Sequence, residues 1–388
     1  MNFKFSEEEE ITKELAAQIL RAGTSFDRLR QIDKDEAGPG FDRELWRQLA
    51  EANLIGLATA EAYGGQGFSF LALCLLLEEA GRTLAPIPLF ESVVETLLPI
   101  EKFGSDSLRK GLLPKVISGE AILTAAFSEI GDSPLSRKAR TRAVASKGGF
   151  ELTGQKLCVP YASGATKILV SASGDAGLGL FLVSPNAKGV SLAAQKTTAH
   201  ERQFVVTLDR VEVTGDDVVA APGRGEAVFD WLSPRASTAL AALGVGAAAE
   251  GLRQTAEYTS TRKQFGREIG SFQGVSLRAA DAYIDVEAMR STMWQAAWRI
   301  DNGDDGAKAA AVAKWWACMG GHRVSHTCQH LHGGIGADID YPIHRFFLRL
   351  KHVAMTLGGA NEQLSLLGGL MAAQARAGAT AGEVLQPC

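Results

Sequence analysis

The sequence predicts an α+β protein in three parts, with an N-terminal α-helical domain, a middle β domain and a C-terminal helical bundle domain. Apolar residues recur at helical spacing in the first third of the chain, and short β-branched runs replace them near residue 120. Long Ala-rich helical stretches return after Pro222–Gly223. The predicted boundaries are therefore 1–122, 123–222 and 223–388.

Helices are expected throughout the first domain because its apolar residues share one face. In the segment 7–20, Ile11, Leu15 and Ile19 lie four residues apart, which places them on one side of a helix. The segment 41–54 repeats this pattern. Further helices are expected at 69–80 and 91–103, with Gly- and Pro-rich turns at 38–40, 64–67 and 86–88.

The middle domain shows the pattern of short strands. Its β-branched or alternating runs are interrupted every few residues by Gly, Ser, Asp or Pro, which is typical of a small barrel or sandwich. The expected strands are 121–127, 143–146, 150–157, 167–171, 179–183 and 203–213.

The C-terminal domain is predicted to be helical to its end. The segment 237–258 carries small residues at Ala241, Gly244 and Ala248, which would let it approach neighbouring helices closely. The remaining helices are expected within 271–300, 307–330 and 343–371.

Composition excludes several classes of protein. The chain has 388 residues and a formal net charge of −4, and no run of Lys and Arg is long enough for a nucleic-acid-binding patch. The acidic N-terminal segment has no apolar core of a signal peptide, and the longest apolar stretches are too short for a membrane span. The five cysteines form no C-x-x-C pair, so we expect buried free thiols, no metal site and a cytoplasmic protein.

Two motifs lie in the C-terminal part. Tyr258, Arg262, Phe265 and Gly266 begin the first motif, which closes on Phe272–Gln273. The spacing resembles the Y-x-x-x-R-x-x-F-G-x-x-(I/L)-x-x-F-Q signature of the acyl-CoA dehydrogenase family.

The second motif and the N-terminal segments extend the same resemblance over nearly the whole chain. Gln329, Gly333, Gly334 and the pair Tyr341–Pro342 are similar to the family's Q-x-x-x-G-G-x-G…YP segment. A weaker match runs through 54–82, with Gly119–Glu120 before the first strand. His330 and His332 are interpreted as ordinary polar residues, because their spacing does not place them on one helix face.

The resemblance implies a fold, a reaction and partners. It implies a β-barrel-like middle domain, a C-terminal four-helix bundle, and α,β-dehydrogenation of an acyl-CoA by FAD. Reduced FAD would pass electrons to an electron-transfer flavoprotein. It also implies that Arg262, Gln264, Phe265 and Gln273 hold the pyrophosphate and adenosine of an FAD bound mainly by a neighbouring subunit, with Gln329, Gly333 and Gly334 adding backbone contacts.

The residue that takes the α-proton in this family is absent from its usual positions. Counted from Tyr341, the glutamate position falls on Leu357, or on Gly358 with a one-residue slip. The alternative position on the earlier long helix falls on Ala236. None of these residues can accept a proton, so the catalytic base is unknown. Glu362, Glu226 and Asp230 are the nearest acids, and Glu362 more resembles a structural acid after the base segment.

The flavin-facing strands also depart from the family pattern. The family's K-x-W-I-(T/S)-N run reads Lys156–Tyr161 here, with Cys158 in the place of Trp and Pro160 in the place of the hydroxyl residue. Pro160 has no N–H to donate. Ser128 is the one residue of the preceding strand end that is expected to face the flavin ring.

The departures from the family pattern are confined to one set of positions, and this suggests a heteromer. Motifs that reach a neighbour's FAD are kept, whereas the contacts to a chain's own flavin ring and the base are altered. The pattern resembles the base-lacking subunit of heteromeric acyl-CoA dehydrogenases of bacterial steroid side-chain degradation. We therefore expect a tetramer with a second, glutamate-bearing chain.

Three other interpretations remain open from the sequence. The first is a self-sufficient homotetramer with a displaced base. The second is a flavin-dependent monooxygenase of the same fold, and the third is a structural subunit without cofactor contact. The retained Arg262-x-x-Phe265 motif counts against the last two. The identity of the acyl group and the residues that contact CoA are not predicted.

Overall fold

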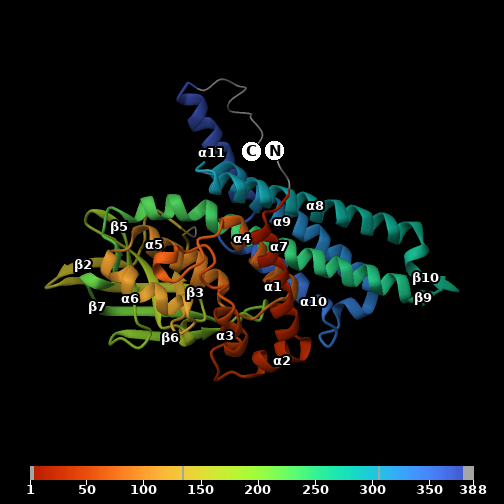
Figure 1. Cartoon of the computed structure of the whole chain (residues 1–388), viewed down its shortest axis with the longest axis horizontal. Helices are drawn as coiled ribbons and strands as arrows, with labels where there is room; N and C mark the ends of the chain where they lie inside the picture. Colours follow the sequence, from red (N-terminus) through yellow and green to blue (C-terminus); the bar gives the residue numbers. More distant parts are fainter. Residues whose placement is uncertain (1–3, 133–134, 305, 379–388) are drawn as a thin grey trace. The chain divides into compact units, whose positions relative to one another are not determined.

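The computed structural model describes residues 4–132, 135–304 and 306–378, and its elements follow the predicted order of helices, strands and helices (Figure 1). Its residues form two compact units. Unit 1 contains the described residues up to Leu73 together with Pro86–Ala236, and unit 2 contains Cys74–Ala85 together with the described residues from Ser237 onward. The domain boundaries at 122 and 222 stay a prediction, since the compact units divide the chain differently.

Four helices of unit 1 begin at side chains that cap them. Ser6 starts α1 with a reciprocal capping box, in which its hydroxyl accepts from Glu9 N at 3.2 Å and Glu9 accepts from Ser6 N at 2.8 Å. Ser25 and Ser105 cap the two helices that apolar spacing did not predict. The helices are α1 (Glu7–Gly23), α2 (Phe26–Lys34), α3 (Arg43–Glu51), α5 (Leu98–Phe103) and α6 (Asp106–Ile117).

Unit 1 also contains an eight-stranded mixed sheet in the order β6-β7-β3-β2-β4-β5-β8, with β1 parallel to β4. Among the described residues its end strands β6 and β8 do not pair with each other, so the sheet is open instead of closing into a barrel. The strands are β1 (Leu123–Ala126), β2 (Arg142–Ser146), β3 (Gly149–Pro160), β4 (Lys167–Gly174), β5 (Gly177–Val183), β6 (Val190–Gln195), β7 (Gln203–Thr214) and β8 (Val218–Ala220).

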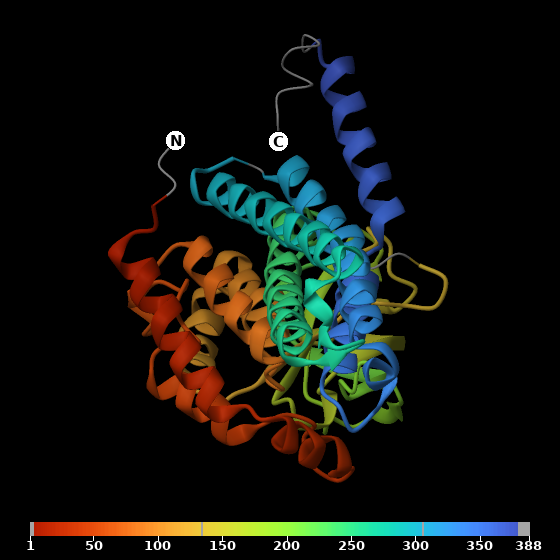
Figure 2. The ribbon, with the colours of Figure 1, turned by 90° about the vertical axis from the view of Figure 1, so that its right-hand side faces the viewer.

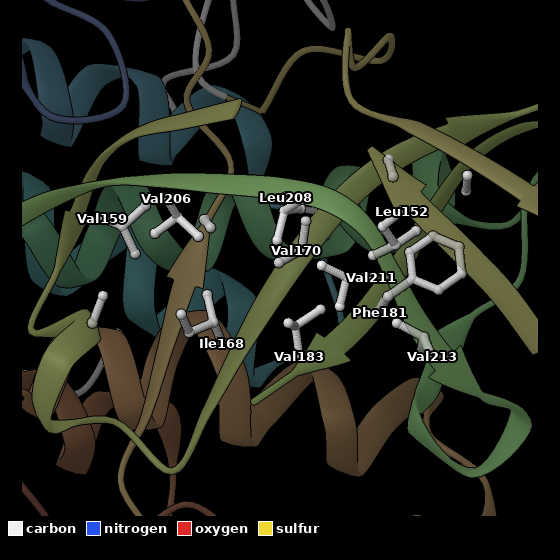
Figure 3. Packing of buried hydrophobic residues seen from close by; sticks show 14 of the residues in the cluster. Leu152, Val159, Ile168, Val170, Phe181, Val183, Val206, Leu208, Val211 and Val213 are labelled. Carbon is white, nitrogen blue, oxygen red and sulfur yellow. The ribbon is translucent and has the colours of Figure 1, made fainter. Parts of the chain in front are cut away.

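Alternating apolar residues of the sheet form its core (Figure 3). Val159, Val170 and Val206 are fully buried, and Phe181 packs edge-on against Phe150. Each such side chain contributes about 1.5–3 kcal/mol when it is removed from water. This core fixes the strand that carries Cys158 and Pro160.

One face of β1 is covered by a π-helical segment, η2 (Phe90–Leu97), in which all eight residues are buried. Ser92 joins the two elements, because its hydroxyl donates to Leu123 O at 2.5 Å and accepts from Leu123 N at 3.0 Å. The predicted single helix at 91–103 is therefore two successive helical segments.

Unit 2 is a bundle of long helices. Helices α8 and α9 lie side by side in both views (Figures 1 and 2), and α10 and α11 also pack on α9. The helices are α7 (Gly225–Thr261), α8 (Gln273–Asp301), α9 (Ala307–His332), α10 (Ile343–Met355) and α11 (Ala360–Arg376). Residues 225–236 of α7 belong to unit 1, and α4 (Phe70–Thr83) is likewise divided between the units.

Within unit 2, α4 and α7 approach each other through glycines. A Cβ on Gly246 would lie 1.8 Å from Glu78 O, and a Cβ on Gly81 would lie 2.1 Å from Leu243 O. The two backbones therefore touch without intervening side chains.

The four cysteines in the described part of the chain are free, but one differs from expectation. Cys74, Cys318 and Cys328 are buried, whereas Cys158 is exposed, so the prediction of buried thiols is wrong for that residue. Cys388 lies outside the described residues. Among the described helices, none combines the length and apolarity needed to cross a membrane.

Candidate functional site

The first motif forms a small hairpin after α7. Strands β9 (Lys263–Gln264) and β10 (Arg267–Glu268) pair, with Phe265 and Gly266 in left-handed conformations at the tip. Ile269 N donates to Arg262 O at 2.9 Å, which closes the base of the hairpin. Phe265 is 92% exposed, so the hairpin presents an aromatic ring to the outside of this chain.

Arg262 is an exposed guanidinium with no acidic partner among the described residues. The alternative interpretation, that Arg262 is present only to form an ion pair on the surface of its helix, therefore has no support. Its neighbour Arg253 on the same helix is, by contrast, bound to Glu250 and Glu257. Gln273 is exposed at the first residue of α8. Arg262 is thus free to bind an external anion.

The second motif forms the end of α9. Gly333 terminates the helix with φ +66°, and Gln329 Nε2 donates to Gly336 O at 3.1 Å to close the following turn. A Cβ on Gly333 or Gly334 would meet no atom within 4 Å, whereas one on Gly336 would lie 2.4 Å from Gln329 O. Gly336 is therefore required by this turn, but Gly334 has open space and an ordinary φ.

An aromatic stack brings the two motifs together within unit 2. The ring of Tyr258 stacks on His332 with 4.5 Å between centroids, and Tyr341 lies edge-on to Tyr258 at 6.5 Å. His332 Nδ1 is 2.8 Å from Cys328 O, and its buried Nε2 has no partner among the described residues. Burial lowers the pKa of His332 and favours the neutral ring.

These residues fit the pyrophosphate and adenosine end of a dinucleotide. They offer a guanidinium without an acidic partner among the described residues at Arg262, an exposed aromatic at Phe265, and side-chain-free space at Gly333 and Gly334. In the described part of the chain, His, Cys, Asp and Glu side chains form no group of three or more that suits a metal ion.

The strands predicted to face a flavin ring lie in unit 1. Leu157 N donates to Ser128 O at 2.9 Å, which holds Ser128 beside β3. Cys158 sits at a bulge with φ +53° and donates its N–H to Gln195 Oε1 at 2.8 Å. Pro160 offers only its carbonyl, which accepts from Thr124 Oγ1 at 2.7 Å. Neither Cys158 nor Pro160 supplies the indole or hydroxyl of the family pattern.

A buried ion pair, which the sequence motifs did not reveal, holds this strand. Lys156 Nζ lies 2.6 Å from Glu129 Oε1 and 3.0 Å from Ser171 Oγ, and both charged side chains are almost fully buried. Burial lowers the pKa of Lys156 to about 8. Burial also acts to raise the pKa of Glu129, but hydrogen bonds from Lys156 and Thr141 outweigh it and lower the pKa.

The position that the sequence comparison predicts for the family's base, Leu357 or Gly358, lies in a turn. Leu357 and Gly358 both have positive φ between α10 and α11. Buried Lys314 donates to Val353 O at 2.7 Å and to Gly358 O at 3.2 Å, and Gln363 Nε2 donates to Leu357 O at 3.2 Å. The shape of the turn is therefore fixed by side chains from α9 and α11.

The alternative base position and the three nearest acids lie on α7 and α11. Ala236 is fully buried in α7. Glu226 and Asp230 both bind Arg137, at 3.2 and 2.6 Å, on the exposed side of that helix. Glu362 is exposed in the first turn of α11.

Comparisons with known proteins agree with this architecture. Residues 6–120 match the model described as acyl-CoA dehydrogenase, N-terminal domain, and residues 224–369 match acyl-CoA dehydrogenase, C-terminal domain. The acyl-CoA dehydrogenase FadE27 of Mycobacterium tuberculosis is 38% identical over 95% of this chain and 98% of its own length.

Solved structures show the same similarity. The ChsE4-ChsE5 complex from Mycobacterium tuberculosis contains a chain with TM-score 0.89 and 38% identity, covering 96% of this chain and 99% of that one. A variant of the Tcur3481-Tcur3483 steroid ACAD contains a chain with TM-score 0.88 and 43% identity, covering 95% of this chain and 99% of that one.

Proposed function

Because the chain belongs to the acyl-CoA dehydrogenase family, we propose that it is the subunit of a heteromeric enzyme that lacks the catalytic base and completes the FAD site of a glutamate-bearing partner. Members of the family are FAD-dependent oxidoreductases that act on the CH–CH bond of an acyl-CoA. The observation that carries the proposal is the contrast between the intact motifs of unit 2 and the residues Leu357, Gly358 and Ala236.

The cofactor would be held across two chains. Arg262 would bind the pyrophosphate, and Gln264, Phe265 and Gln273 would cover the adenosine. Gln329 would keep the turn in shape, so that the cofactor could approach the backbone closely at Gly333 and Gly334, where no side chain intervenes. Bound FAD supplies the hydride acceptor for the reaction.

The partner would provide the remaining chemistry. Its carboxylate would take the α-proton, while Ser128 of this chain remains a candidate for contact with a flavin ring. Electrons would leave through an electron-transfer flavoprotein. Since one similar structure is a steroid ACAD and another is a two-component complex, we propose a bulky, steroid-type acyl-CoA as the substrate.

A spectrum combined with a native mass tests the proposal. The chain expressed alone is expected to carry little flavin, and co-expression with a glutamate-bearing paralogue is expected to give a yellow tetramer with one FAD per pair of chains. One FAD per chain in a homotetramer that turns over acyl-CoA would contradict it. The self-sufficient enzyme would then be the right interpretation.

A further inference from the structure

An aromatic stack joins the last turns of two helices in unit 2. His332 is the last residue of α9, and Tyr258 lies three residues before α7 ends at Thr261. The two rings are nearly parallel, with an interplanar angle of 18° and 4.5 Å between their centroids. The stack is therefore a contact between α7 and α9 beside the segments that follow both helices.

Each ring is attached to a segment that is expected to hold FAD. Tyr258 O accepts from Arg262 N at 2.9 Å, so the backbone of Tyr258 holds the first residue after α7. His332 directly precedes Gly333, whose N–H donates to His330 O where α9 ends. A change in the separation of the two rings would therefore change the separation of Arg262 and Gly333.

The imidazole of His332 is held in one orientation. Its Nδ1 lies 2.8 Å from Cys328 O, and since a carbonyl can only accept, the ring proton is on Nδ1. His332 is 3% exposed, and its Nε2 has no hydrogen-bond partner among the described residues. The bond to Cys328 fixes the plane of the ring against Tyr258, which a phenylalanine in the same place could not do.

Further contacts support the stack from two sides. The ring centroid of Tyr341 lies 5.3 Å from that of His332 and 6.5 Å from that of Tyr258, so a third ring packs against the pair. Two turns before Tyr258, α7 also approaches α9, because a Cβ on Gly251 would lie 3.9 Å from Cys328 Sγ. The stack thus continues the packing of α7 on α9 to the ends of both helices.

We infer that His332 is a positioning residue for FAD, which through its stack on Tyr258 sets the separation between Arg262 and the turn at Gly333–Gly334 so that both reach one cofactor. The inference rests on the proposed function and deepens it, since it names the side chains that align the two motifs. It requires no contact between His332 and FAD. The two motifs must then be coupled in their effect on FAD affinity.

A double-mutant cycle on FAD affinity tests this coupling. FAD is titrated into the flavin-depleted, co-expressed assembly that contains the wild-type chain, His332→Ala, Arg262→Ala or both changes. His332→Ala is expected to weaken FAD binding about tenfold alone but about twofold or less beside Arg262→Ala, because misalignment matters only while Arg262 is present. The fall in Tm from His332→Ala should be the same in both backgrounds, since Arg262 has no acidic partner among the described residues.

Conservative variants separate the ring from its hydrogen bond. His332→Phe keeps an aromatic ring but loses the bond to Cys328 O, so FAD affinity should fall about threefold. Tyr258→Phe keeps the stack and should bind FAD within about twofold of the wild type, whereas Tyr258→Leu should match His332→Ala. His330→Ala is the matched control, because His330 is exposed in the same last turn of α9 and should leave FAD affinity unchanged.

Additive losses in the cycle, or equal FAD affinity of His332→Ala and His330→Ala, would overturn the inference and leave the proposed function standing. If His332→Ala does not assemble, the same cycle is run with His332→Phe and is decided by the same results. One FAD per chain in a homotetramer that turns over acyl-CoA, with the coupling intact, would overturn the proposed function instead. Unchanged FAD affinity in Arg262→Ala would overturn both, so the failures are distinguishable.

Discussion

The ends of α7 and α9 in unit 2 and the end of β3 in unit 1 differ in whether their polar groups are bonded within the chain. At the ends of α7 and α9, unit 2 exposes Arg262, Phe265 and two glycines that its own packing does not occupy. At the end of β3, where the sequence predicts a surface that faces a flavin, unit 1 has a bulge, a proline and buried acids. Arg262 has no acidic partner among the described residues, whereas Cys158 and Pro160 both form hydrogen bonds within the chain.

The largest expected effect comes from the buried pair beneath β3. Lys156→Met would leave the Glu129 carboxylate buried without its cation, so the free energy of unfolding is expected to fall by about 3–5 kcal/mol in urea titrations. Lys167→Met removes the partly exposed pair with Asp217 on the same sheet, and is expected to cost about 1 kcal/mol or less. Equal losses would mean that unit 1 does not depend on the internal pair.

A pH series tests the protonation of Glu95, a buried acid of η2 whose pKa is raised by burial and by the carboxylate of Glu201. The folded pKa of Glu95 is raised, so folding binds a proton between the unfolded value of 4.5 and about 8, and stability falls as pH rises through this window. Glu95→Gln is expected to gain about 3 kcal/mol over the wild type on going from pH 5 to pH 8. Parallel unfolding profiles for the two proteins would show that Glu95 is not protonated in the fold.

Removal of the exposed Arg262 guanidinium is expected to lower FAD affinity and to leave the stability of the fold unchanged. Arg262→Ala removes a charge-assisted bond worth about 1.5–3 kcal/mol, so FAD affinity of the co-expressed assembly should fall about 10–100-fold with an unchanged Tm. Arg253→Ala on the same helix, where the side chain is bound to Glu250 and Glu257, is the control. Full FAD occupancy in Arg262→Ala would reject its role.

The smallest expected effect distinguishes two glycines of one turn. Gly334→Ala should leave stability within about 0.5 kcal/mol, since its Cβ meets nothing, while FAD affinity falls severalfold. Gly336→Ala should lower the Tm by several degrees because its Cβ would meet Gln329 O. Thermal melts with and without added FAD measure both, and a destabilised Gly334→Ala would contradict the assignment of open space.

Elements with their own periodicity were predictable from the sequence. Helix α1 and strand β4 begin at the residues where their apolar patterns predicted them to begin, because the spacing of apolar residues follows which face of an element is buried. Helices α2 and α6 were missed since their apolar faces are short and their strongest signals are the caps Ser25 and Ser105. Strand β6 was missed since none of its residues is fully buried, so its sequence carries few strongly apolar residues to detect.

The candidate site likewise contains residues that local patterns indicated and pairs that they did not. Motif spacing made Arg262 and Gly334 candidates, and they stay predictions. The stack of Tyr258 on His332 joins residues far apart in the chain, and no local pattern encodes it. The same holds for Glu129 with Lys156 and for Glu95 with Glu201. A single lysine within an apolar stretch, as at Lys314, was the signal that could have indicated a buried bond.

The glycine contact between α4 and α7 has a consequence for dissecting the chain. Because Cys74–Ala85 belongs to unit 2 while its sequence neighbours belong to unit 1, the chain passes between the units three times. A fragment that starts at Ser237 would lack Cys74–Ala85, which packs against Gly246. A fragment that ends at Ala236 would contain Cys74–Ala85 but not the part of α7 against which it packs. No single truncation can therefore isolate either half, and separate expression would require moving twelve residues from one gene fragment to the other.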